Sequence, residues 1–437
     1  MLEKFYIYSK PYQIMLDINL IRENPELVKK NQLRANKKIS AVEDVLKLDE
    51  KWRTLKQNVD KLRAKRNKIS EIINQAKKAK DEAAAKKLIK EAKLIPEEIK
   101  ETEEKADKIL EKRDEVLRTI PNIISKQTPK GEGDKDNKEI KKVGKPKSFS
   151  FKIKNHVELC EELGLADFDA SSEVAGNGFY YLKKELALLN QALIQYSINY
   201  MWKKGYEYIE PPLMIRKKLY QEDNITFANS IYEIKDQETV LIGTAEHALL
   251  AMHTNHIFKE KDLPKKYFAY SMCFRKEIGA HGINEKGLWR THQFNKVEQF
   301  VFCKPEESEK IYEELLENSE GILKELDLPY RVIELCTGDL APHKFRSHDL
   351  EVWRPTTKSY GEVMSLSNVT DYQARDLGIK FRRKDHNEIV HTLNNTAMAT
   401  SRILVAILEN NQNADGSIDI PKTLHKYLPF KKIKNGP

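Results

Sequence analysis

The first 130 residues of the chain contain no glycine, and all seventeen glycines of the sequence stand at Gly131 or later. Within this stretch, apolar residues recur at alternating spacings of three and four, the period of the a and d positions of a coiled coil. The first series consists of Val45, Leu48, Trp52, Leu55, Val59 and Leu62, continuing through Arg66 to Ile69 and Ile73. The second consists of Ile95, Ile99, Thr102, Ala106, Ile109, Arg113, Val116 and Ile120. The period predicts two long helices.

The charged, alanine-rich stretch 81–93 separates the two series, so each helix can cover its apolar seam by folding back on the other. We therefore expect an antiparallel helical hairpin over residues 41–120, a coiled-coil arm. Each helix of about 30 residues would be about 45 Å long. Pro96 lies inside the second series and should kink or restart that helix.

Positive charge is concentrated on this arm. The chain carries a formal net charge of +9, and residues 51–80 alone hold eleven Lys and Arg against two Asp and Glu. The remaining residues therefore sum to zero. A local excess of this kind is typical of a surface that binds a polyanion, and RNA is the partner that we favour. The periodicity alone also admits a dimerisation coiled coil with a solvated, charged face.

The composition is otherwise that of a globular protein, with 40% hydrophobic and 33% charged residues. No apolar run approaches the roughly 18 residues that span a bilayer. The first 15 residues are broken by Lys4, Lys10 and Pro11, unlike a secretory signal, so we expect a cytoplasmic protein. The cysteines are Cys160, Cys273, Cys303 and Cys336. No two of them form a C-x-x-C pair, so we expect reduced thiols and no zinc.

Composition divides the chain into three parts. Residues 1–124 form an expected N-terminal domain that carries the arm, and residues 125–148 are polar, charged and punctuated by Pro and Gly, as in a linker. Residues 149–437 alternate between helix and strand patterns. A helix is expected at 186–200, capped by Gly205, and strands are expected at 206–214, 265–277, 291–302, 330–338, 348–355 and 360–368. Several of these strands look like hairpin partners, so we expect an α+β domain with an antiparallel sheet flanked by helices.

The densest group of polar residues lies around one predicted hairpin. Arg275 and Glu277 precede a loop, and Phe294 and Glu298 follow it. If both flanks are strands, period-2 alternation places each pair on one face of its strand. An arginine suits a phosphate or carboxylate, a phenylalanine can stack on a base, and a carboxylate accepts from an ammonium or a hydroxyl group. The group predicts a site for an anionic ligand with an aromatic ring, with a surface hairpin of cross-strand ion pairs as the alternative.

Five ordered blocks of the sequence resemble those of a known family. The pattern F-R-x-E, loop, R-x-x-x-F-x-x-x-E at 274–298 resembles motif 2 of the class II aminoacyl-tRNA synthetases, and its wider text is similar to seryl-tRNA synthetases in particular. GYEYIEPP at 205–212 resembles motif 1, and the segment 390–412 resembles motif 3. GTAEHAL at 243–249 and the segment 349–375 resemble two further blocks of the same family, and all five blocks follow in the family's order. The resemblance covers nearly the whole chain after about Met15, which is a second candidate for the native start, with Met1–Gln13 outside it.

The resemblance implies a class II catalytic domain that activates L-serine with ATP and Mg²⁺ and transfers it to the 3′ end of tRNA(Ser), with tRNA(Sec) as a further candidate substrate. It also implies a homodimer built through the motif 1 region. The arm matches the family's tRNA-binding hairpin, and its contacts to tRNA would be made by Lys61, Arg63, Lys65, Arg66 and Lys68. Adenylation brings two anions together, so cations must offset their repulsion, and arginine stays charged near pH 7.

Roles for individual residues follow from the same resemblance. The catalytic residues would be Arg275, Glu298 and Arg402. Serine would be bound by Thr244, Ala245, Glu246, Arg275, Glu298, Asn394 and Thr396. Within this set, Thr244 and Glu246, taken as alternate residues of a strand edge, would receive the ammonium group, and Glu298 and Thr396 the hydroxyl group. ATP would be bound by Arg275, Lys276, Glu277, Thr291, Phe294, Glu362, Val363, Met364, Ser365 and Arg402.

Glu362 and Ser365 would hold the magnesium ion. Strict strand alternation places these two side chains on opposite faces, so shared coordination requires a bulge or a strand end. Many relatives have other residues at Gly361, Met364 and Leu366, and glycines at the positions of Asn395, Ala397 and Ser401. We expect the backbone there to be preserved. No catalytic role is expected for the histidines His247, His281, His292 and His391.

Two other classes of protein fit parts of this pattern. A non-catalytic paralogue could bind RNA or protein, but it would have no need for the buried charges of Arg275, Glu298 and Arg402. A stand-alone ligase that loads an amino acid onto a carrier protein would have no use for the basic arm. The arm and the charged residues together favour an active synthetase.

Overall fold

The computed structural model describes residues 16–220, 230–277 and 286–434. The candidate start at Met15 and the loop 278–285, which contains His281, lie outside the described residues. The chain divides into two compact units, of which one ends at Pro121 and the other begins at Asn122. None of the described helices is long and apolar enough to cross a membrane.

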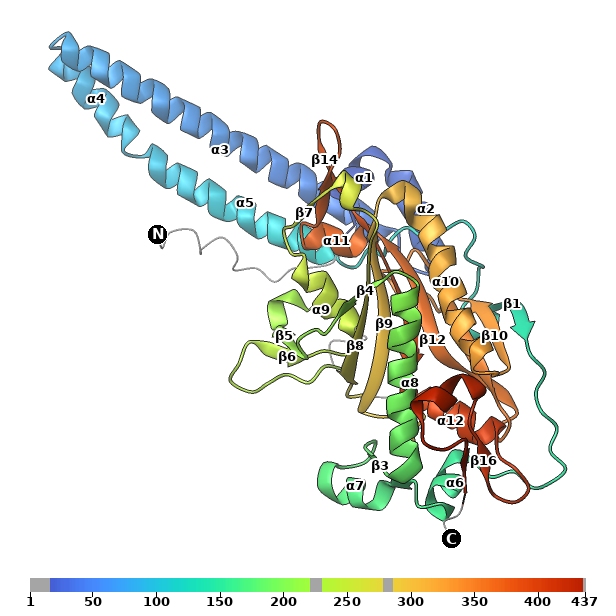
Figure 1. Ribbon diagram of the computed structural model, residues 1–437. Helices are drawn as coiled ribbons and strands as arrows, with labels where there is room; N and C mark the ends of the chain where they lie inside the picture. Colours follow the sequence, from blue (N-terminus) through green and yellow to red (C-terminus); the bar gives the residue numbers. More distant parts are fainter. Residues whose placement is uncertain (1–15, 221–229, 278–285, 435–437) are drawn as a thin grey trace. The chain divides into compact units, whose positions relative to one another are not determined.

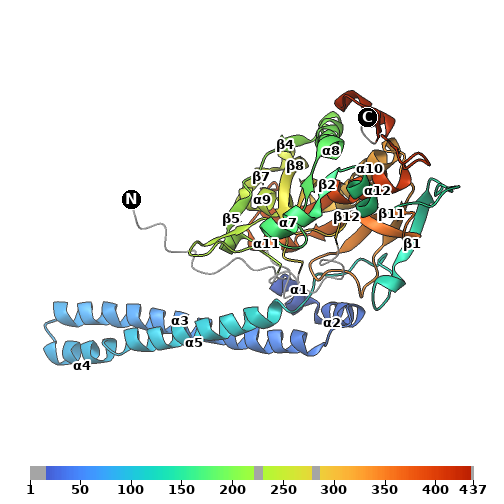
Figure 2. The ribbon, with the colours of Figure 1, turned by 90° about the horizontal axis from the view of Figure 1, so that it is seen from below.

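The first unit is a helical hairpin preceded by two short helices (Figures 1 and 2). Its elements are α1 (Ile18–Glu23), α2 (Pro25–Arg34), α3 (Ser40–Lys78), α4 (Glu82–Ala92) and α5 (Ile95–Leu117). Helix α3 packs antiparallel against α4 and α5, which confirms the predicted hairpin. Pro96 lies in the first turn of α5, where proline needs no hydrogen-bond partner for its nitrogen, so the second helix restarts there.

The structure adds two details to the predicted hairpin. The stretch 81–93 contains helix α4, which packs on α3, and Glu91 of this helix forms an ion pair of 2.8 Å with Lys65. Arg66, placed on the seam by its spacing, is exposed, whereas Val59 and Ile69 on the same helix are buried in the hairpin core. A charged side chain at a seam position leaves the interface because its burial would need a partner.

Arg113, the other charged residue on a seam, is buried because it has such a partner. The Asp49 carboxylate is fully buried, and it accepts hydrogen bonds from Arg22, Arg53 and Arg113 at 2.7–3.0 Å. Burial alone would raise the pKa of Asp49, but the hydrogen bonds from Arg22 and Arg113 hold it below its ordinary value. This ionic cluster ties α1, α3 and α5 together.

The second unit is built on an eight-stranded sheet with the order β1-β10-β11-β12-β15-β9-β8-β4. In that order the strands are β1 (Lys138–Val143), β10 (Tyr330–Glu334), β11 (Arg346–Arg354), β12 (Ser359–Thr370), β15 (His391–Ala399), β9 (Gln293–Cys303), β8 (Lys265–Phe274) and β4 (Glu207–Ile209). All neighbouring pairs are antiparallel except β4 and β8. The α+β fold expected from the sequence is confirmed.

The predicted linker 125–148 is wrong in one part, because β1 lies within it and pairs with β10 at the edge of the sheet. Its side chains are exposed on both faces except for the half-buried Val143. Such a strand has no apolar alternation by which a sequence could reveal it. Its lysines and glutamate suit an edge that must not pair with another chain.

Helices cover both faces of the sheet (Figure 1). Helices α8 (Lys184–Lys203), α10 (Ser308–Glu325) and α12 (Thr400–Asn410) pack on the face that carries Val297, Val301 and Leu393. The expected Gly205 follows α8 with a positive φ of 81°. On the other face, α9 (Ala245–Met252) and α11 (Tyr372–Asp376) pack near the buried rings of Phe300 and Phe302.

The remaining elements are short. They are α6 (His156–Glu162), α7 (Phe168–Ala175), β2 (Ala166–Asp167), β3 (Tyr181–Leu182), β5 (Met214–Arg216), β6 (Thr239–Leu241), β7 (Ile257–Lys259), β13 (Lys380–Arg382), β14 (Asn387–Ile389), β16 (Ile418–Asp419) and β17 (Lys432–Ile433), with 3-10 turns at 134–136, 217–219, 260–262, 305–307 and 422–427.

Candidate active site

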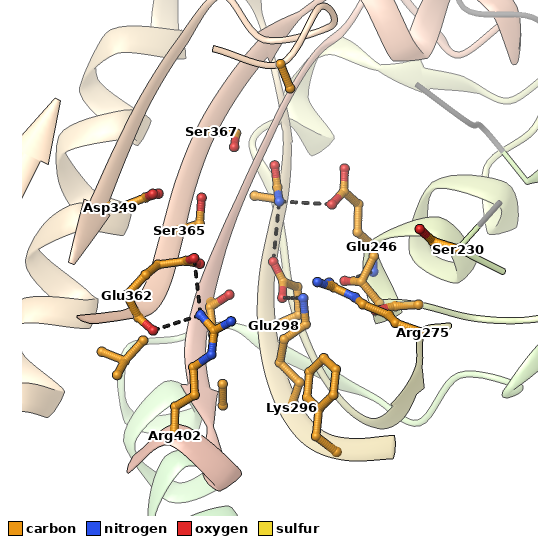
Figure 3. A pocket seen from close by; sticks show the side chains of 18 of the residues that line it. Ser230, Glu246, Arg275, Lys296, Glu298, Asp349, Glu362, Ser365, Ser367 and Arg402 are labelled. Carbon is orange, nitrogen blue, oxygen red and sulfur yellow. Dashed lines mark hydrogen bonds and ion pairs between the residues drawn. The ribbon is translucent and has the colours of Figure 1, made fainter. Parts of the chain in front are cut away.

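A cavity of about 360 Å³ opens on the sheet face opposite α8 and α10 (Figure 3). Residues of β9, β12, β15, α9 and α12 line it. Most of the residues expected to bind serine, ATP or magnesium line it together: Thr244, Glu246, Arg275, Glu277, Thr291, Phe294, Glu298, Glu362, Val363, Ser365, Asn394, Thr396 and Arg402. These residues come from segments more than 150 positions apart in the sequence, so the fold brings them together.

Three expected residues do not line the cavity. Ala245 and Met364 are buried in the hydrophobic core, on the sides of their elements that face away from the cavity. The Lys276 ammonium lies over the ring of Tyr232, 5.9 Å from its centroid. Side-chain contacts from these three to a ligand in the cavity are therefore not supported by the geometry.

Two carboxylates from different elements meet at one end of the cavity. Asn394 donates to Glu246 Oε2 at 2.9 Å and to Glu298 Oε1 at 3.4 Å, and so bridges them. Lys296 Nζ lies 2.5 Å from Glu298 Oε2. Burial raises the pKa of Glu298, and repulsion from Glu246 adds to this, while Lys296 acts against both. The Arg275 guanidinium lies on the same side of the cavity (Figure 3).

The register of the strands explains part of this group. Thr396 lies directly opposite Glu298 in the β15–β9 pair, so their side chains share one face of the sheet. A bulge follows at Ala397, after which Met398 pairs with Val297. Asn395 points to the other face and is fully buried, where it donates to Leu315 O and Ser319 Oγ.

Thr244 and Glu246 do not form a strand edge, so that prediction was wrong. Thr244 is the N-cap of α9, and its hydroxyl accepts from the backbone N–H of Glu246 at 3.3 Å. Threonine is a preferred N-cap, and a carboxylate is stabilised in the first turn of a helix. The residues keep the predicted proximity for a different structural reason.

Arg275 and Glu277 also lie outside the predicted strand, because β8 ends at Phe274. Arg275 is held in place by its backbone, whose N–H donates to His292 O, and by its Nε, which donates to Gly243 O at 3.1 Å. Its guanidinium lies 5.3 Å from the centre of the Phe294 ring. Glu277 has a positive φ of 50° and pairs with Arg290 at 3.0 Å.

A second polar group occupies the other side of the cavity (Figure 3). Arg402 Nη1 lies 3.1 Å from Glu362 Oε2 and donates to Glu362 O at 2.8 Å. Between Glu362 and Met364 the pairing of β12 with β11 shifts by one residue. This bulge turns Glu362 to the face of Ser365, so the bulge that the magnesium assignment required is present.

The donor set fits a magnesium ion. Asp349 lies opposite Ser365 on β11, and its buried Oδ1 has no hydrogen-bond partner among the described residues. Burial raises the pKa of Asp349 to about 7, and the nearby charge of Glu362 adds to the shift. No group of three or more His, Cys, Asp and Glu side chains in the described ranges could hold a metal alone. Magnesium commonly takes one or two carboxylates and completes its shell with phosphates and water.

Sequence reasoning missed Trp289, which forms a wall of the cavity. Two guanidinium groups lie against its ring, with that of Arg354 4.1 Å and that of Arg402 5.4 Å from the ring centroid. A Cβ atom at position 361 would lie 2.4 Å from this ring, so the glycine at this position makes room for the tryptophan. The unusual Gly361 is therefore linked to Trp289.

Lys296, Asp349 and Gln373 were also missed, although all three line the cavity. A signal existed for Lys296, because alternation on β9 places it on the face of Phe294 and Glu298. Asp349 required the register of β11 against β12, and Gln373 required the tertiary position of α11. The histidines His247 and His292 lie at or near the cavity, and His292 bonds Arg275 O through Nδ1 at 2.9 Å.

Two family models match the chain. Residues 15–124 match the seryl-tRNA synthetase N-terminal domain, and residues 230–411 match the class II tRNA synthetase core domain for G, H, P, S and T. A serine–tRNA ligase of Methanospirillum hungatei is 45% identical over 96% of this chain and 100% of its own length, and one of Pyrococcus furiosus is 44% identical over 96% and 97%.

Solved structures agree with these matches. The seryl-tRNA synthetase of Pyrococcus horikoshii, crystallised with ATP, has a TM-score of 0.90 at 41% identity and covers 97% of this chain with all of its own. The cytoplasmic serine–tRNA ligase of Naegleria fowleri, crystallised with AMP, has a TM-score of 0.86 at 33% identity, with the same coverage. The chain therefore belongs to the seryl-tRNA synthetases, the serine–tRNA ligases of the class II aminoacyl-tRNA synthetases.

Proposed function

We propose that this serine–tRNA ligase activates L-serine with ATP and Mg²⁺ in the cavity and transfers the seryl group to tRNA(Ser) bound through the arm. The observation that carries the proposal is the meeting of Glu246, Glu298 and Arg275 at one end of a single cavity, with Arg402 and Glu362 at the other. A zwitterionic amino acid and a polyphosphate need these two environments. The relatives' names and the ATP bound in the Pyrococcus horikoshii structure support the assignment.

The serine end is balanced in charge. Glu246 and Glu298 carry two negative charges, and Lys296 and Arg275 carry two positive ones. A serine zwitterion adds no net charge, and it can place its ammonium group at Glu246 and its carboxylate at Arg275. A ligand without the ammonium group would leave an uncompensated charge in a buried site, which is costly.

The hydroxyl group of serine would bind between Glu298 and Thr396, which face each other across β9 and β15. A site built to hydrogen-bond a hydroxyl group can reject the analogue that lacks it by about 10⁴ to 10⁵. Alanine would leave these buried groups unpaired, and threonine would be excluded by its additional methyl group. Selection for serine then needs no separate editing site.

In the nucleotide site, Phe294 would stack on the adenine, with Glu277 and Thr291 beside the nucleotide. Arg275 would bind the α-phosphate, and Arg402 would bind the terminal phosphate. Glu362 and Ser365 would hold magnesium, which offsets phosphate charge when it is bound. The serine carboxylate oxygen then forms a bond to the α-phosphorus, the bond to the β-phosphate oxygen breaks, and pyrophosphate leaves.

The arm would bring tRNA to this chemistry. Its proposed contacts, Lys61, Arg63, Lys65, Arg66 and Lys68, are all exposed on α3. Phosphate contacts of this kind supply affinity by releasing counterions from RNA. A homodimer through the motif 1 region, a tRNA(Sec) substrate and a cytoplasmic location stay predictions of the family resemblance.

The test is the exchange of labelled pyrophosphate into ATP, measured with each of the twenty amino acids. We expect serine to support exchange and alanine and threonine to fail at equal concentration. Arg275→Ala should abolish the signal while leaving the thermal unfolding midpoint close to that of the parent. Exchange that needs an amino acid other than serine, or none with any amino acid, would contradict the proposal.

A further inference from the structure

Glu246 is held by a buried hydrogen-bond chain that the proposed roles do not include. Gln373 Nε2 donates to Glu246 Oε1 at 2.7 Å, and the Thr392 hydroxyl donates to Gln373 Oε1 at 2.9 Å. Gln373 is 3% exposed and Thr392 is fully buried. The chain therefore connects α11 and β15 to the first turn of α9, below the serine end of the cavity.

The direction of each hydrogen bond is set by chemistry. The Thr392 hydroxyl donates to the amide oxygen of Gln373, which leaves the amide nitrogen to face Glu246. A carboxylate can only accept, so this orientation satisfies Glu246, and a flipped amide would set two oxygens against each other. The carboxylate thus determines which end of Gln373 faces it, and the Thr392 hydroxyl holds the amide oxygen in that orientation.

Glu246 is held from both sides. Gln373 donates to Oε1, and Asn394 donates to Oε2 at 2.9 Å. Two donors on opposite oxygens fix the plane of the carboxylate, yet each oxygen keeps a further lone pair for a ligand. Binding groups whose orientation is fixed in advance lose less entropy on binding and discriminate better between ligands.

We infer that Gln373 and Thr392 are positioning residues that hold Glu246 ready for the ammonium group of serine and thereby set selectivity for an α-amino acid. The inference rests on the proposed function, because it takes Glu246 as the ammonium acceptor. It adds Gln373 of α11, which lines the cavity, and Thr392 of β15, which is buried behind it, and both would act through Glu246.

The main test is Gln373→Met, which keeps length and removes the amide. Pyrophosphate exchange would give KM for serine, KM for ATP and kcat, and 3-hydroxypropanoate, which lacks the amino group, would be the competing inhibitor. We expect the KM for serine to rise roughly tenfold or more, because a hydrogen bond to a charged group is lost. The KM for ATP and the inhibition constant of 3-hydroxypropanoate should stay within about twofold.

A matched control is Gln412→Met. Gln412 is a buried glutamine that bonds to Lys154 and Glu409 through their backbones, and it does not line the cavity. This variant should lose stability without changing the preference for serine over 3-hydroxypropanoate. If both variants raise the KM for serine equally, or if Gln373→Met raises the KM for ATP as much as that for serine, Gln373 is merely structural and the inference fails.

Thr392 offers an independent test should Gln373→Met fold poorly. Thr392→Val removes the hydroxyl group that holds the amide oxygen of Gln373, so the KM for serine should rise, and Thr392→Ser should restore it. Equal kinetics for the valine and serine variants would overturn the inference. Glu246→Gln distinguishes a failure of the proposed function from a failure of the positioning role. If it leaves the KM for serine unchanged, the proposed ammonium site is itself wrong. If it raises the KM for serine while Gln373→Met does not, only the positioning role is wrong.

Discussion

Thr396 and Glu298 face each other across two strands, and each is nearly buried at the serine end of the cavity. Thr396→Val keeps the shape of the side chain and removes its hydroxyl group. We predict that this change lowers kcat/KM for serine by the equivalent of about 1–3 kcal/mol, because the substrate hydroxyl group loses one of its two hydrogen-bond partners and keeps only Glu298. Exchange kinetics measure it, with the KM for ATP as the internal control. Unchanged serine kinetics would show that Thr396 does not face the substrate.

Glu362 is the residue on which the magnesium assignment depends. We predict that Glu362→Gln sharply lowers exchange and raises the magnesium concentration required, because an amide supplies less charge to a hard cation. The matched control is Glu351→Gln, since Glu351 lies opposite Glu362 in the register but pairs with Arg331 and does not line the cavity. Identical magnesium titrations for Glu362→Gln and the control would refute the assignment.

At this scale the sequence predicted which residues meet, but not how they are held. Thr244 and Glu246 were correctly grouped, yet the reason is a helix N-cap, which a short segment between two weak strands does not reveal. Glu362 and Ser365 lie on one face of β12 because of a bulge, and its position is visible only in the pairing with β11. Gln373 could not be found, because its partners are distant in sequence and its own surroundings carry no motif.

Among the secondary-structure elements, α3 and α5 were the most predictable, because a heptad pattern sustained over several turns leaves little choice of fold. The strand β1 was the least predictable, because both of its faces are exposed. The ionic cluster around Asp49 was predictable in part. The sequence placed Arg113 on the seam, but its acceptor Asp49 and the other arginine that Asp49 binds, Arg22, lie 64 and 91 positions away along the chain.

This cluster should make the stability of the hairpin depend on pH. The pKa of Asp49 is lowered in the folded chain, so its contribution is present above the ordinary aspartate pKa of about 3.9 and is lost as the pH falls through the lower folded value. Asp49→Asn should destabilise the hairpin by about 1.5–3 kcal/mol near pH 7, because Arg22 and Arg113 lose a buried charged acceptor, although Arg113 keeps its ion pair with Asp114. Hydrogen exchange of the α3 and α5 amides measures the loss. Protection equal to that of the parent at pH 7 would contradict it.

The basic face of α3 gives a prediction about RNA. Arg63 and Lys65 form ion pairs with Glu103 and Glu91 across the hairpin, so their removal would also weaken the arm. A cleaner variant replaces Lys61, Arg66 and Lys68 by glutamine. It should bind tRNA more weakly, with a shallower dependence of the logarithm of affinity on the logarithm of salt concentration.

The matched control replaces Lys100, Lys108 and Lys112 on α5 by glutamine. These lysines are also exposed, but they alternate with acidic residues along the helix. The control should change tRNA affinity less, and binding titrations over a range of salt concentrations would compare the two variants. Equal losses of affinity would show that the charge concentrated on α3 has no special role.

In the whole molecule, the excess positive charge and the cavity belong to different units of the fold. The net charge of +9 is matched by residues 51–80 alone, within the helical unit, while the cavity lies entirely in the unit that begins at Asn122. The central claim is that the two steps of the reaction are divided accordingly: the cavity activates serine, and the arm is needed to bring tRNA to it.

One measurement tests this division most directly. Residues 57–107 are replaced by a short Gly-Asn-Gly linker, which keeps the cluster of Arg22, Asp49 and Arg113 at the base of the hairpin. Serine-dependent pyrophosphate exchange and charging of tRNA(Ser) are then measured on the same preparation. We predict exchange near that of the parent and charging reduced by orders of magnitude. If the shortened enzyme charged tRNA as well as the parent does, or lost both activities together while still folded, the division would be wrong.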